Sequence, residues 1–300
     1  MLDSNHIKQL VIECGASLCG ISRTIRLEQD ATFLLDWIKN GYSSSLDYLH
    51  KNTNLRTNIE EMVPGAQSVI VCAFAYKNSC SSGYKSSCKK KIASYAICED
   101  YHTTIRKALN KVLKQLENKY EVKGRVFTDS APIFEKAYAV NAGLGWIGKQ
   151  SLLVTPEFGT FVLLGEIVID QKCDQYDIPF SENRCGTCRK CVEACPNHAI
   201  MERHIDTRLC ISRATIEKQD TNSIALHGWV FGCDECQNAC PYSKHGPQNS
   251  SGILKPIFNP ELIDWDKMTD EEFITSLSKT PLKRSGLKRI ITNYFKNHIV

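Results

Sequence analysis

The chain has 300 residues, of which 42% are hydrophobic and 23% are charged, and its formal net charge is +4. This composition is ordinary for a soluble globular protein, and the length predicts one large domain with a smaller one. No apolar run approaches the roughly 18 residues of a membrane span, and the N-terminus lacks the basic and apolar regions of a signal peptide. We therefore expect a cytoplasmic protein with no membrane segment. The net charge is too small by itself to indicate a nucleic-acid partner.

The first predicted elements follow from hydrophobic periodicity. Residues 4–18 carry apolar side chains at helical spacing and predict a helix. The run 68–76 is short, apolar and rich in β-branched residues, so it predicts a buried strand. Residues 99–118 place one apolar stripe among lysines and an arginine, which is typical of an amphipathic helix.

A second group of elements follows in the middle of the chain. A strand is predicted over 125–128, and the helix after it has Ser130 as a possible N-cap and Pro132 near its first turn. Gly143 is a good breaker and is expected to end that helix. Two further strand-like runs cover residues 151–155 and 160–169.

Strands that alternate with helices indicate an α/β or α+β domain over residues 1–172. A polar linker opens the next region, and a ferredoxin-like module is expected over 173–246. Short helices, 271–277 and 287–296 among them, are predicted in a C-terminal segment over 247–300.

Two runs of cysteines carry the strongest chemical signal. The first is C-x2-C-x2-C-x3-C-P from Cys185 to Pro196, and the second is C-x2-C-x3-C-P from Cys233 to Pro241, with Cys210 upstream. The first spacing is that of bacterial ferredoxins, in which three thiolates hold one 4Fe–4S cluster and the fourth holds its neighbour. One predicted ligand set is therefore Cys185, Cys188, Cys191 and Cys240. The other is Cys195, Cys210, Cys233 and Cys236.

Two other uses of these cysteines fit the sequence less well. Zinc sites usually have paired C-x2-C knuckles, and disulfides need an oxidising compartment. The remaining cysteines have no metal-ligand spacing, and we interpret most of them as small buried hydrophobic residues. They are Cys14, Cys19, Cys72, Cys80, Cys88, Cys98 and Cys173.

Three polar or glycine-rich features have more than one interpretation. Gly143, Gly145 and Gly148 form G-x-G-x-x-G, but they follow a helix, so a sharp turn is favoured over a dinucleotide loop. Asp129 ends a predicted strand and could be either a helix cap or a ligand-site residue. The motif Asp100-Tyr101-His102 is most simply a capped, exposed first helical turn.

Basic residues gather in two stretches. Lys85, Lys89, Lys90 and Lys91 lie in a serine-rich stretch, where a solvated loop and a phosphate-binding patch are equally acceptable interpretations. A second group lies near the C-terminus and comprises Lys283, Arg284, Lys288, Arg289 and Lys296.

Taken together, the chain resembles epoxyqueuosine reductases, which depend on iron–sulfur clusters and cobalamin. The resemblance lies in Tyr95, in DYH from Asp100, in DSAP from Asp129 and in AGLGWIGK from Ala142. It continues in TPEFG from Thr155, LGE from Leu164, the first cysteine run and FGCDECQNACP from Phe231. These motifs span nearly the whole chain. Many members extend further into helical repeats, so this chain resembles a short form.

The resemblance implies that the protein reduces an epoxide to an alkene on epoxyqueuosine in tRNA, consuming two electrons and two protons. It implies Asp129 as the proton donor above the cobalt, with burial raising its pKa. Cobalamin is expected in the base-off form, because the D-x-H-x-x-G motif is missing. The positions implied to contact cobalamin are Arg56, Cys98, Leu153, Leu164, Ser212, Cys233 and Asp234, and Gln219 is implied to face tRNA.

The resemblance also implies partners. The substrate nucleotide lies in an anticodon loop and is expected to enter a pocket over the cobalt, with C-terminal basic residues on phosphates. A flavodoxin or ferredoxin system is the expected electron donor, and the chain is expected to be a monomer. Two alternatives are a reductive dehalogenase, which usually carries a twin-arginine signal that is absent here, and a plain two-cluster electron carrier.

Overall fold

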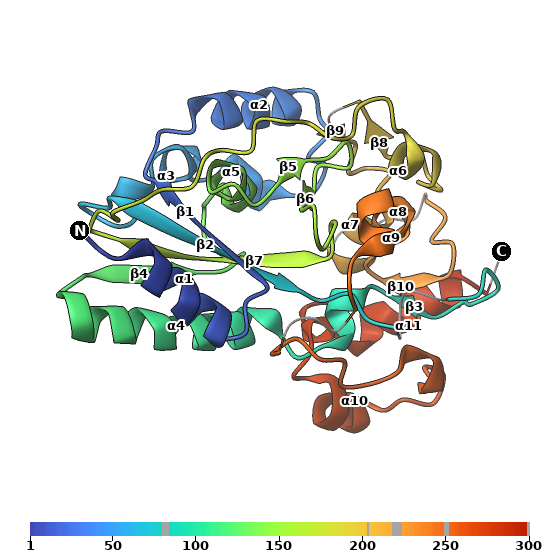
Figure 1. The fold of residues 1–300 in the computed structure, drawn as a ribbon. Coiled ribbons are helices and arrows are strands. Elements are labelled where there is room, and N and C mark those ends of the chain that lie inside the picture. Colours follow the sequence, from blue (N-terminus) through green and yellow to red (C-terminus); the bar gives the residue numbers. More distant parts are fainter. Residues whose placement is uncertain (80–83, 203, 218–223, 249–251, 299–300) are drawn as a thin grey trace.

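The structure, a computed structural model, describes residues 1–79, 84–202, 204–217, 224–248 and 252–298. Its first half is built on a four-stranded sheet in the order β1-β2-β7-β4 (Figure 1). These strands are Leu18–Arg23 for β1, Ser68–Ala75 for β2, Val162–Ile169 for β7 and Gly124–Phe127 for β4. Every neighbouring pair is antiparallel, so of the two predicted fold classes the sheet matches α+β.

Helices cover both faces of this sheet. Helices α1 (Ser4–Glu13) and α4 (Tyr101–Tyr120) lie on one face, and α5 (Glu135–Asn141) lies on the other. Helices α2 (Glu28–Lys39) and α3 (Thr53–Thr57) stand on the same side as α5 (Figure 1). Since both faces are covered, all eight residues of β2 are buried, as the apolar run predicted.

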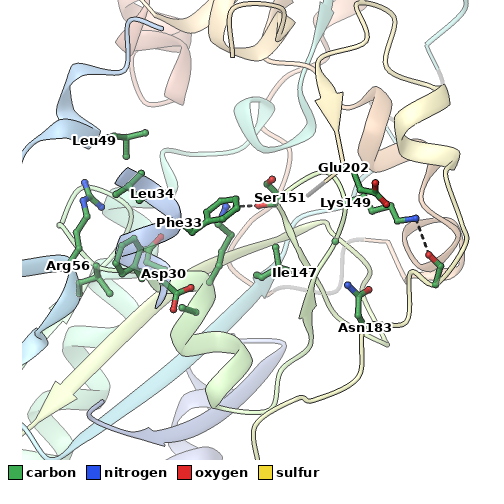
Figure 2. Close-up of a pocket in the computed structure, with 17 residues that line it drawn as sticks. Asp30, Phe33, Leu34, Leu49, Arg56, Ile147, Lys149, Ser151, Asn183 and Glu202 are labelled. Atoms are coloured by element: carbon green, nitrogen blue, oxygen red, sulfur yellow. Dashed lines mark hydrogen bonds between the residues drawn. The ribbon is translucent and has the colours of Figure 1, made fainter. Parts of the chain in front are cut away.

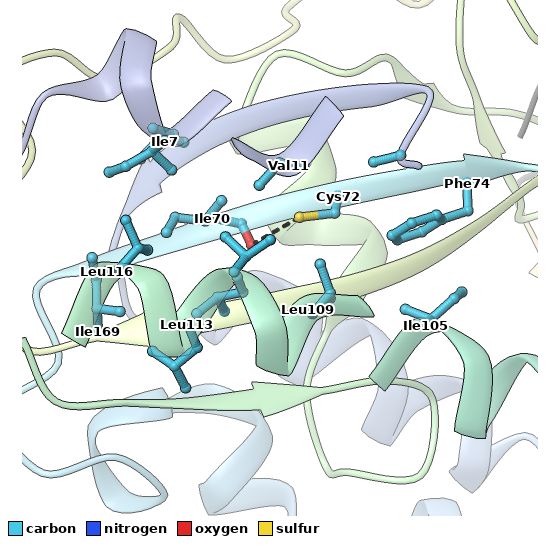
Figure 3. Packing of buried hydrophobic residues seen from close by; sticks show 14 of the residues in the cluster. Ile7, Val11, Ile70, Cys72, Phe74, Ile105, Leu109, Leu113, Leu116 and Ile169 are labelled. Atoms are coloured by element: carbon cyan, nitrogen blue, oxygen red, sulfur yellow. Dashed lines mark hydrogen bonds between the residues drawn. The ribbon is translucent and has the colours of Figure 1, made fainter. Parts of the chain in front are cut away.

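The face toward α1 and α4 forms a continuous apolar core. Alternate residues of β2, among them Ile70 and Phe74, pack with Ile105 and Leu109 of α4 (Figure 3). Each such side chain contributes roughly 1.5–3 kcal/mol when it is fully buried. Gly165 of β7 lies under α4, where an added Cβ would press on Ile105 and Leu109. The glycine thus lets α4 approach the sheet closely, which fixes where the N-terminus of α4 stands.

The second half of the chain has short elements. A hairpin of β5 (Trp146–Ile147) and β6 (Leu153–Val154) precedes β7, and the second half follows β7. The region of the cysteine runs contains α6 (Lys190–Glu193), β8 (Ile200–Met201), β9 (His204–Ile205), α7 (Ile211–Ile216), β10 (Trp229–Phe231), α8 (Glu235–Ala239) and α9 (Pro241–His245). Helices α10 (Asp270–Leu277) and α11 (Gly286–Lys296) follow it.

The three predicted domains share cores across their boundaries. Strand β3 (Lys91–Ile92) pairs in parallel with β10, and α11 packs on β10. Residues of the 3-10 helix Ser94–Ile97, of β10 and of α10 and α11 form one apolar cluster. The predicted boundaries themselves stay a prediction. Within the described residues, no helix has both the length and the apolar character needed to cross a bilayer.

The helix predicted over residues 4–18 is too long, because α1 ends at Glu13 and β1 begins at Leu18. Another local prediction is wrong. The helix after Asp129 does not begin at a Ser130 cap, because α5 starts at Glu135 with Phe134 at its N-cap and no side-chain cap. The intervening residues are used by tight turns, in which Ser130 N–H donates to Thr128 O and Ile133 N–H donates to Ala131 O. The predicted stop is confirmed, since α5 ends at Asn141 and Gly143 has a φ of 74°.

Candidate active site

Asp129 stands directly after β4 in a strained turn. Its φ is 53°, a value that residues with a side chain rarely adopt, and the Ser130 N–H to Thr128 O bond of 2.6 Å closes a three-residue turn around it. The side chain of Asp129 is 46% exposed, so a ligand can reach its carboxylate. Strained backbone of this kind gathers at functional sites.

Two side chains from the start of α4 hold this carboxylate. The Tyr101 hydroxyl donates to Asp129 Oδ2 at 3.0 Å, and His102 Nε2 lies 2.8 Å from the same oxygen. On its other side, His102 Nδ1 lies 2.7 Å from Asp100 Oδ1. Asp100 also caps α4 by accepting the His102 backbone N–H at 3.0 Å, as the capped-turn interpretation predicts. The turn has a second role, because it presents an imidazole to Asp129.

The two carboxylates set the charge of the imidazole between them. Burial lowers the pKa of His102, but hydrogen bonds to Asp100 and Asp129 and their charges outweigh it and raise that pKa to about 9. Burial likewise raises the pKa of Asp129, yet the hydrogen bonds from His102 and Tyr101 and the charge of His102 bring it below its usual value. The expectation of a raised Asp129 pKa is therefore wrong, and near neutral pH the proton resides on His102.

A cavity of about 790 Å³, here called the main cavity, lies between α2, α5 and the β5–β6 hairpin (Figure 2). Apolar side chains such as Phe33, which is 52% exposed, form part of its wall. Arg56 of α3 also lines it, and its Nε is buried with no hydrogen-bond partner among the described residues. Gly186, from the loop of the first cysteine run, borders the same cavity.

A smaller side cavity of about 330 Å³ adjoins the main one, and Phe33, Leu34 and Ser151 line both. Its far wall comes from the second predicted cluster site, since Cys210 and Ser212 line it. Segments of both predicted cluster sites thus border the connected cavities.

The other predicted contact residues lie at varied depths. Leu153 and Leu164 are buried in the core under α5, and Cys98 is buried with α10 and α11, so none of the three lines either cavity. Asp234 is buried and accepts the Ser94 N–H at 2.7 Å, while Cys233 packs against the cluster around Trp229. Gln219 lies outside the described residues.

The cluster cysteines gather in two groups. Cys185 and Cys240 act electrostatically on Cys191, and Cys195 acts on Cys210. Cys210, Cys195 and also Cys191 act on Cys236, so the two groups lie close to each other. Cys233 is next to Cys236 and Cys210. Two N–H groups donate to cysteine sulfurs. Trp146 Nε1–H donates to Cys185 Sγ at 3.3 Å, and the Ala199 backbone N–H donates to Cys195 Sγ at 3.2 Å. The assignment of individual cysteines to the two clusters, with Cys195 and Cys240 crossing between the runs, stays a prediction.

The glycines after α5 behave as the turn interpretation predicts. A Cβ on Gly145 would collide with the backbone carbonyl of Val154 across the β5–β6 hairpin, and one on Gly148 would meet Gln150 Oε1 at 2.5 Å. The glycines thus allow backbone to approach backbone.

Comparison with known proteins places the chain. Residues 56–130 match a family described as epoxyqueuosine reductase QueG, DUF1730, and residues 184–243 match a 4Fe-4S double cluster binding domain. An epoxyqueuosine reductase of Cyclobacterium marinum is 38% identical over 98% of this chain and 94% of its own length. This chain belongs to the epoxyqueuosine reductase family. It is therefore an oxidoreductase, and residues 184–243 form a module for two 4Fe–4S clusters, which decides against the zinc and disulfide interpretations.

Solved structures of the family share the fold. A crystal structure of epoxyqueuosine reductase with an epoxyqueuosine-modified tRNA-Tyr stem loop matches with a TM-score of 0.88 at 23% identity, covering 98% of this chain and 80% of that one. Another, from Bacillus subtilis, has a catalytic aspartate loop swung out of the active site, with a TM-score of 0.87 at 23% identity and the same coverage.

Sequence reasoning missed two residues of this site. His102 and Glu135 both bond to Asp129, the latter through Glu135 Oε1 and the Asp129 N–H at 2.6 Å. A signal for His102 was present in the DYH motif, but position alone favoured a simple cap. No pattern in the sequence pointed to Glu135.

Proposed function

We propose that the protein reduces epoxyqueuosine in tRNA to queuosine, using cobalamin in the main cavity and two 4Fe–4S clusters. The reaction converts an epoxide to an alkene: both C–O bonds of the epoxide break, the C–C bond between them becomes C=C, two electrons and two protons are consumed, and the oxygen leaves as water. The observation that carries the proposal is Asp129, which is accessible and bonded both to His102 and to Glu135, a residue that lines the main cavity.

The main cavity suits a large, flat and largely apolar macrocycle with polar side groups. Phe33 and Ile147 offer apolar surface, and the unpartnered Arg56 Nε offers a donor for a carbonyl or phosphate oxygen. The side cavity adds space toward Cys210. When bound, reduced cobalamin supplies a strongly nucleophilic and reducing cobalt. We propose the base-off form because the sequence has no D-x-H-x-x-G motif.

The His102–Asp129 pair is proposed to move one of the two protons. The proton starts on His102 Nε2, which donates to Asp129 Oδ2, and Asp129 passes it to the oxygen that leaves the substrate. Asp100 keeps the imidazole oriented through Nδ1, and Tyr101 steadies the same carboxylate oxygen. The clusters deliver electrons one at a time, and a flavodoxin or ferredoxin is the proposed donor.

A tRNA stem loop is the proposed substrate, as in the solved complex of the family. Two basic residues act on the site. The charge of Arg284 helps to lower the pKa of Asp129, and its guanidinium also pairs with Glu217 at 2.8 Å. The charge of Lys283, the preceding residue, helps to lower the pKa of Asp100. These side chains would meet RNA phosphates as the nucleotide enters.

The proposal is tested by anaerobic incubation of the reconstituted protein with epoxyqueuosine tRNA, a reductant and either cobalamin or buffer, followed by analysis of the nucleosides. We expect queuosine only with cobalamin, together with corrinoid absorption bands of the base-off form. A protein that carries both clusters but binds no corrinoid would be an electron carrier instead. Removal of halogen from an aryl halide, with no action on the tRNA, would favour the dehalogenase alternative.

A further inference from the structure

Two glutamates near Asp129 have no part in the mechanism above. Glu135 is half-buried and lines the main cavity. Glu166 of β7 is completely buried, and among the described residues neither of its carboxylate oxygens has an N–H or hydroxyl donor. Its ionisable neighbour is Glu135, the first residue of α5, and each of the two carboxyl groups acts on the pKa of the other. Glu135 Oε1 also accepts the backbone N–H of Asp129 at 2.6 Å.

Two adjacent carboxyl groups repel each other unless one of them is protonated. Burial is the main cause that raises the pKa of Glu135 to about 7, and it raises the pKa of Glu166 well above its usual value. These shifts favour a protonated Glu166 at neutral pH. The ionisable groups that act on the pair from surrounding elements are Asp129, Lys136, Arg56, Tyr101 and Cys72. Lys136 Nζ donates to Ser151 O at 2.6 Å.

The pair connects a rigid element to a strained one. Glu166 lies in β7 between β2 and β4, opposite Val71 and Phe127, so its position is fixed by two strands. Asp129 is held at a φ of 53°, a backbone conformation that relaxes unless contacts oppose it. The hydrogen bond from the Asp129 N–H to Glu135 is such a contact, because it holds the backbone of the turn. His102 and Tyr101 instead bond to the Asp129 carboxylate.

We propose that Glu135 is a positioning residue that latches the Asp129 turn in its active position through the Asp129 N–H, and that the buried Glu166 supports Glu135 from β7. This inference rests on the proposed role of Asp129. The latch accounts for a buried acid in β7 that would otherwise only destabilise the fold.

The first test compares Glu135→Leu with Glu135→Gln. Leucine removes the acceptor, whereas glutamine keeps an oxygen for the Asp129 N–H and adds an N–H for Glu166. At saturating cobalamin and neutral pH, we expect Glu135→Leu to lower kcat roughly tenfold or more, the size of one lost charge-assisted hydrogen bond, with KM for tRNA within about twofold. Glu135→Gln should restore kcat to within about threefold of the wild type.

A second readout does not depend on turnover. Amide hydrogen exchange of a peptide covering residues 128–133 should become roughly tenfold faster in Glu135→Leu and stay close to wild type in Glu135→Gln. A peptide from the far half of α4, residues 110–120, is the internal control and should exchange alike in all variants. Thermal unfolding identifies any variant that does not fold.

A double-mutant cycle tests the part of Glu166. If Glu166 acts only through Glu135, adding Glu166→Leu to Glu135→Leu should change kcat by less than about twofold, whereas Glu166→Leu alone lowers it measurably. Glu166→Gln, which can donate to Glu135, should rescue the single change. Should one of the Glu166 variants not fold, the Glu135 pair alone decides the latch.

The latch is overturned if Glu135→Leu leaves both kcat and exchange at residues 128–133 unchanged, or if Glu135→Gln is as impaired as Glu135→Leu. Failure of the proposed function has a different signature. In that case the wild type makes no queuosine, yet the two Glu135 variants still differ in exchange as described.

Discussion

At the residue scale, hydrogen-bond partners rather than depth determine the state of Asp129. Burial alone would raise the pKa of its carboxyl group, but His102 and Tyr101 both donate to one oxygen and reverse the direction. In the reaction proposed above, the acid that serves the epoxide is the His102–Asp129 pair, with the imidazole holding the proton. This arrangement keeps a proton available at neutral pH although Asp129 itself is ionised.

The pair makes a prediction for pH dependence. The pKa of His102 is raised to about 9, so its proton is present at lower pH and is lost as pH rises through about 9. We expect kcat of the wild type to fall above that pH. The pKa of Glu135 is about 7, and Glu135 is not the proton donor. Its titration should therefore not change the fall of kcat above pH 9.

Replacement of His102 by glutamine should remove the alkaline limb and lower kcat about 100-fold, the usual size of a general-acid contribution. The measurement is a kcat–pH profile from pH 6 to 10. His6→Gln is a matched control, because His6 lies beside Tyr120 at the opposite end of α4. An unchanged alkaline limb in His102→Gln would refute the assignment of the proton to His102.

At the element scale, the start of α4 and the end of β4 must meet for the site to exist. Gly165 lets α4 lie close to β7, because Ile105 and Leu109 occupy the space of a Cβ. Ile105 is one helical turn from Tyr101 and His102. Gly165→Ala should therefore reduce the free energy of unfolding by about 1–3 kcal/mol and lower kcat by displacing both side chains.

Chemical denaturation and turnover of Gly165→Ala check this, with Gly252→Ala as the control because a Cβ there meets open space. Equal stability of the two variants would contradict the close-approach argument.

The elements also indicate what sequence alone could give. The cysteine runs were found from their spacing in the sequence, and β2 and α4 were predicted from hydrophobic periodicity. Both signals are local, so they can be read from neighbouring residues. The sequence did not reveal the bond between His102 and Asp129, which are 27 residues apart, or the bond from Glu135 to the Asp129 backbone. Nor did it decide the antiparallel direction of β7, which depends on how the chain returns through the β5–β6 hairpin. The prediction of a Ser130 cap was wrong because Ser130 belongs to a tight turn, in which its N–H bonds to Thr128 O, and α5 begins only at Glu135.

At the scale of the whole molecule, we propose that each cysteine run contributes a ligand to the other cluster site. We expect Cys240→Ser to reduce bound iron from about eight to about four atoms per chain, because it removes a ligand from the site of Cys185, Cys188 and Cys191. Iron analysis after reconstitution measures this. Cys88→Ser, at a cysteine without ligand spacing, should keep all the iron, and loss of iron in both variants would argue against the assigned ligand sets.

The basic surface beside the site should make tRNA binding dependent on salt. Lys283 is exposed and acts on Asp100, so we expect Lys283→Gln to weaken binding and to reduce the slope of log affinity against log salt by roughly one. Lys119→Gln, at the far end of α4, is the control and should keep the wild-type slope. Affinity of the wild type that does not change with salt would contradict a phosphate contact.

The most direct measurement of the whole account is a single-turnover assay under anaerobic conditions with pre-reduced, cobalamin-loaded protein and epoxyqueuosine tRNA. It compares the wild type with Asp129→Asn and with Asp36→Asn, an exposed aspartate of α2. We predict that Asp129→Asn keeps its iron and corrinoid spectra and loses at least about 100-fold in the rate of queuosine formation, whereas Asp36→Asn matches the wild type. Queuosine formed by Asp129→Asn at the wild-type rate would contradict the central role of the His102–Asp129 pair.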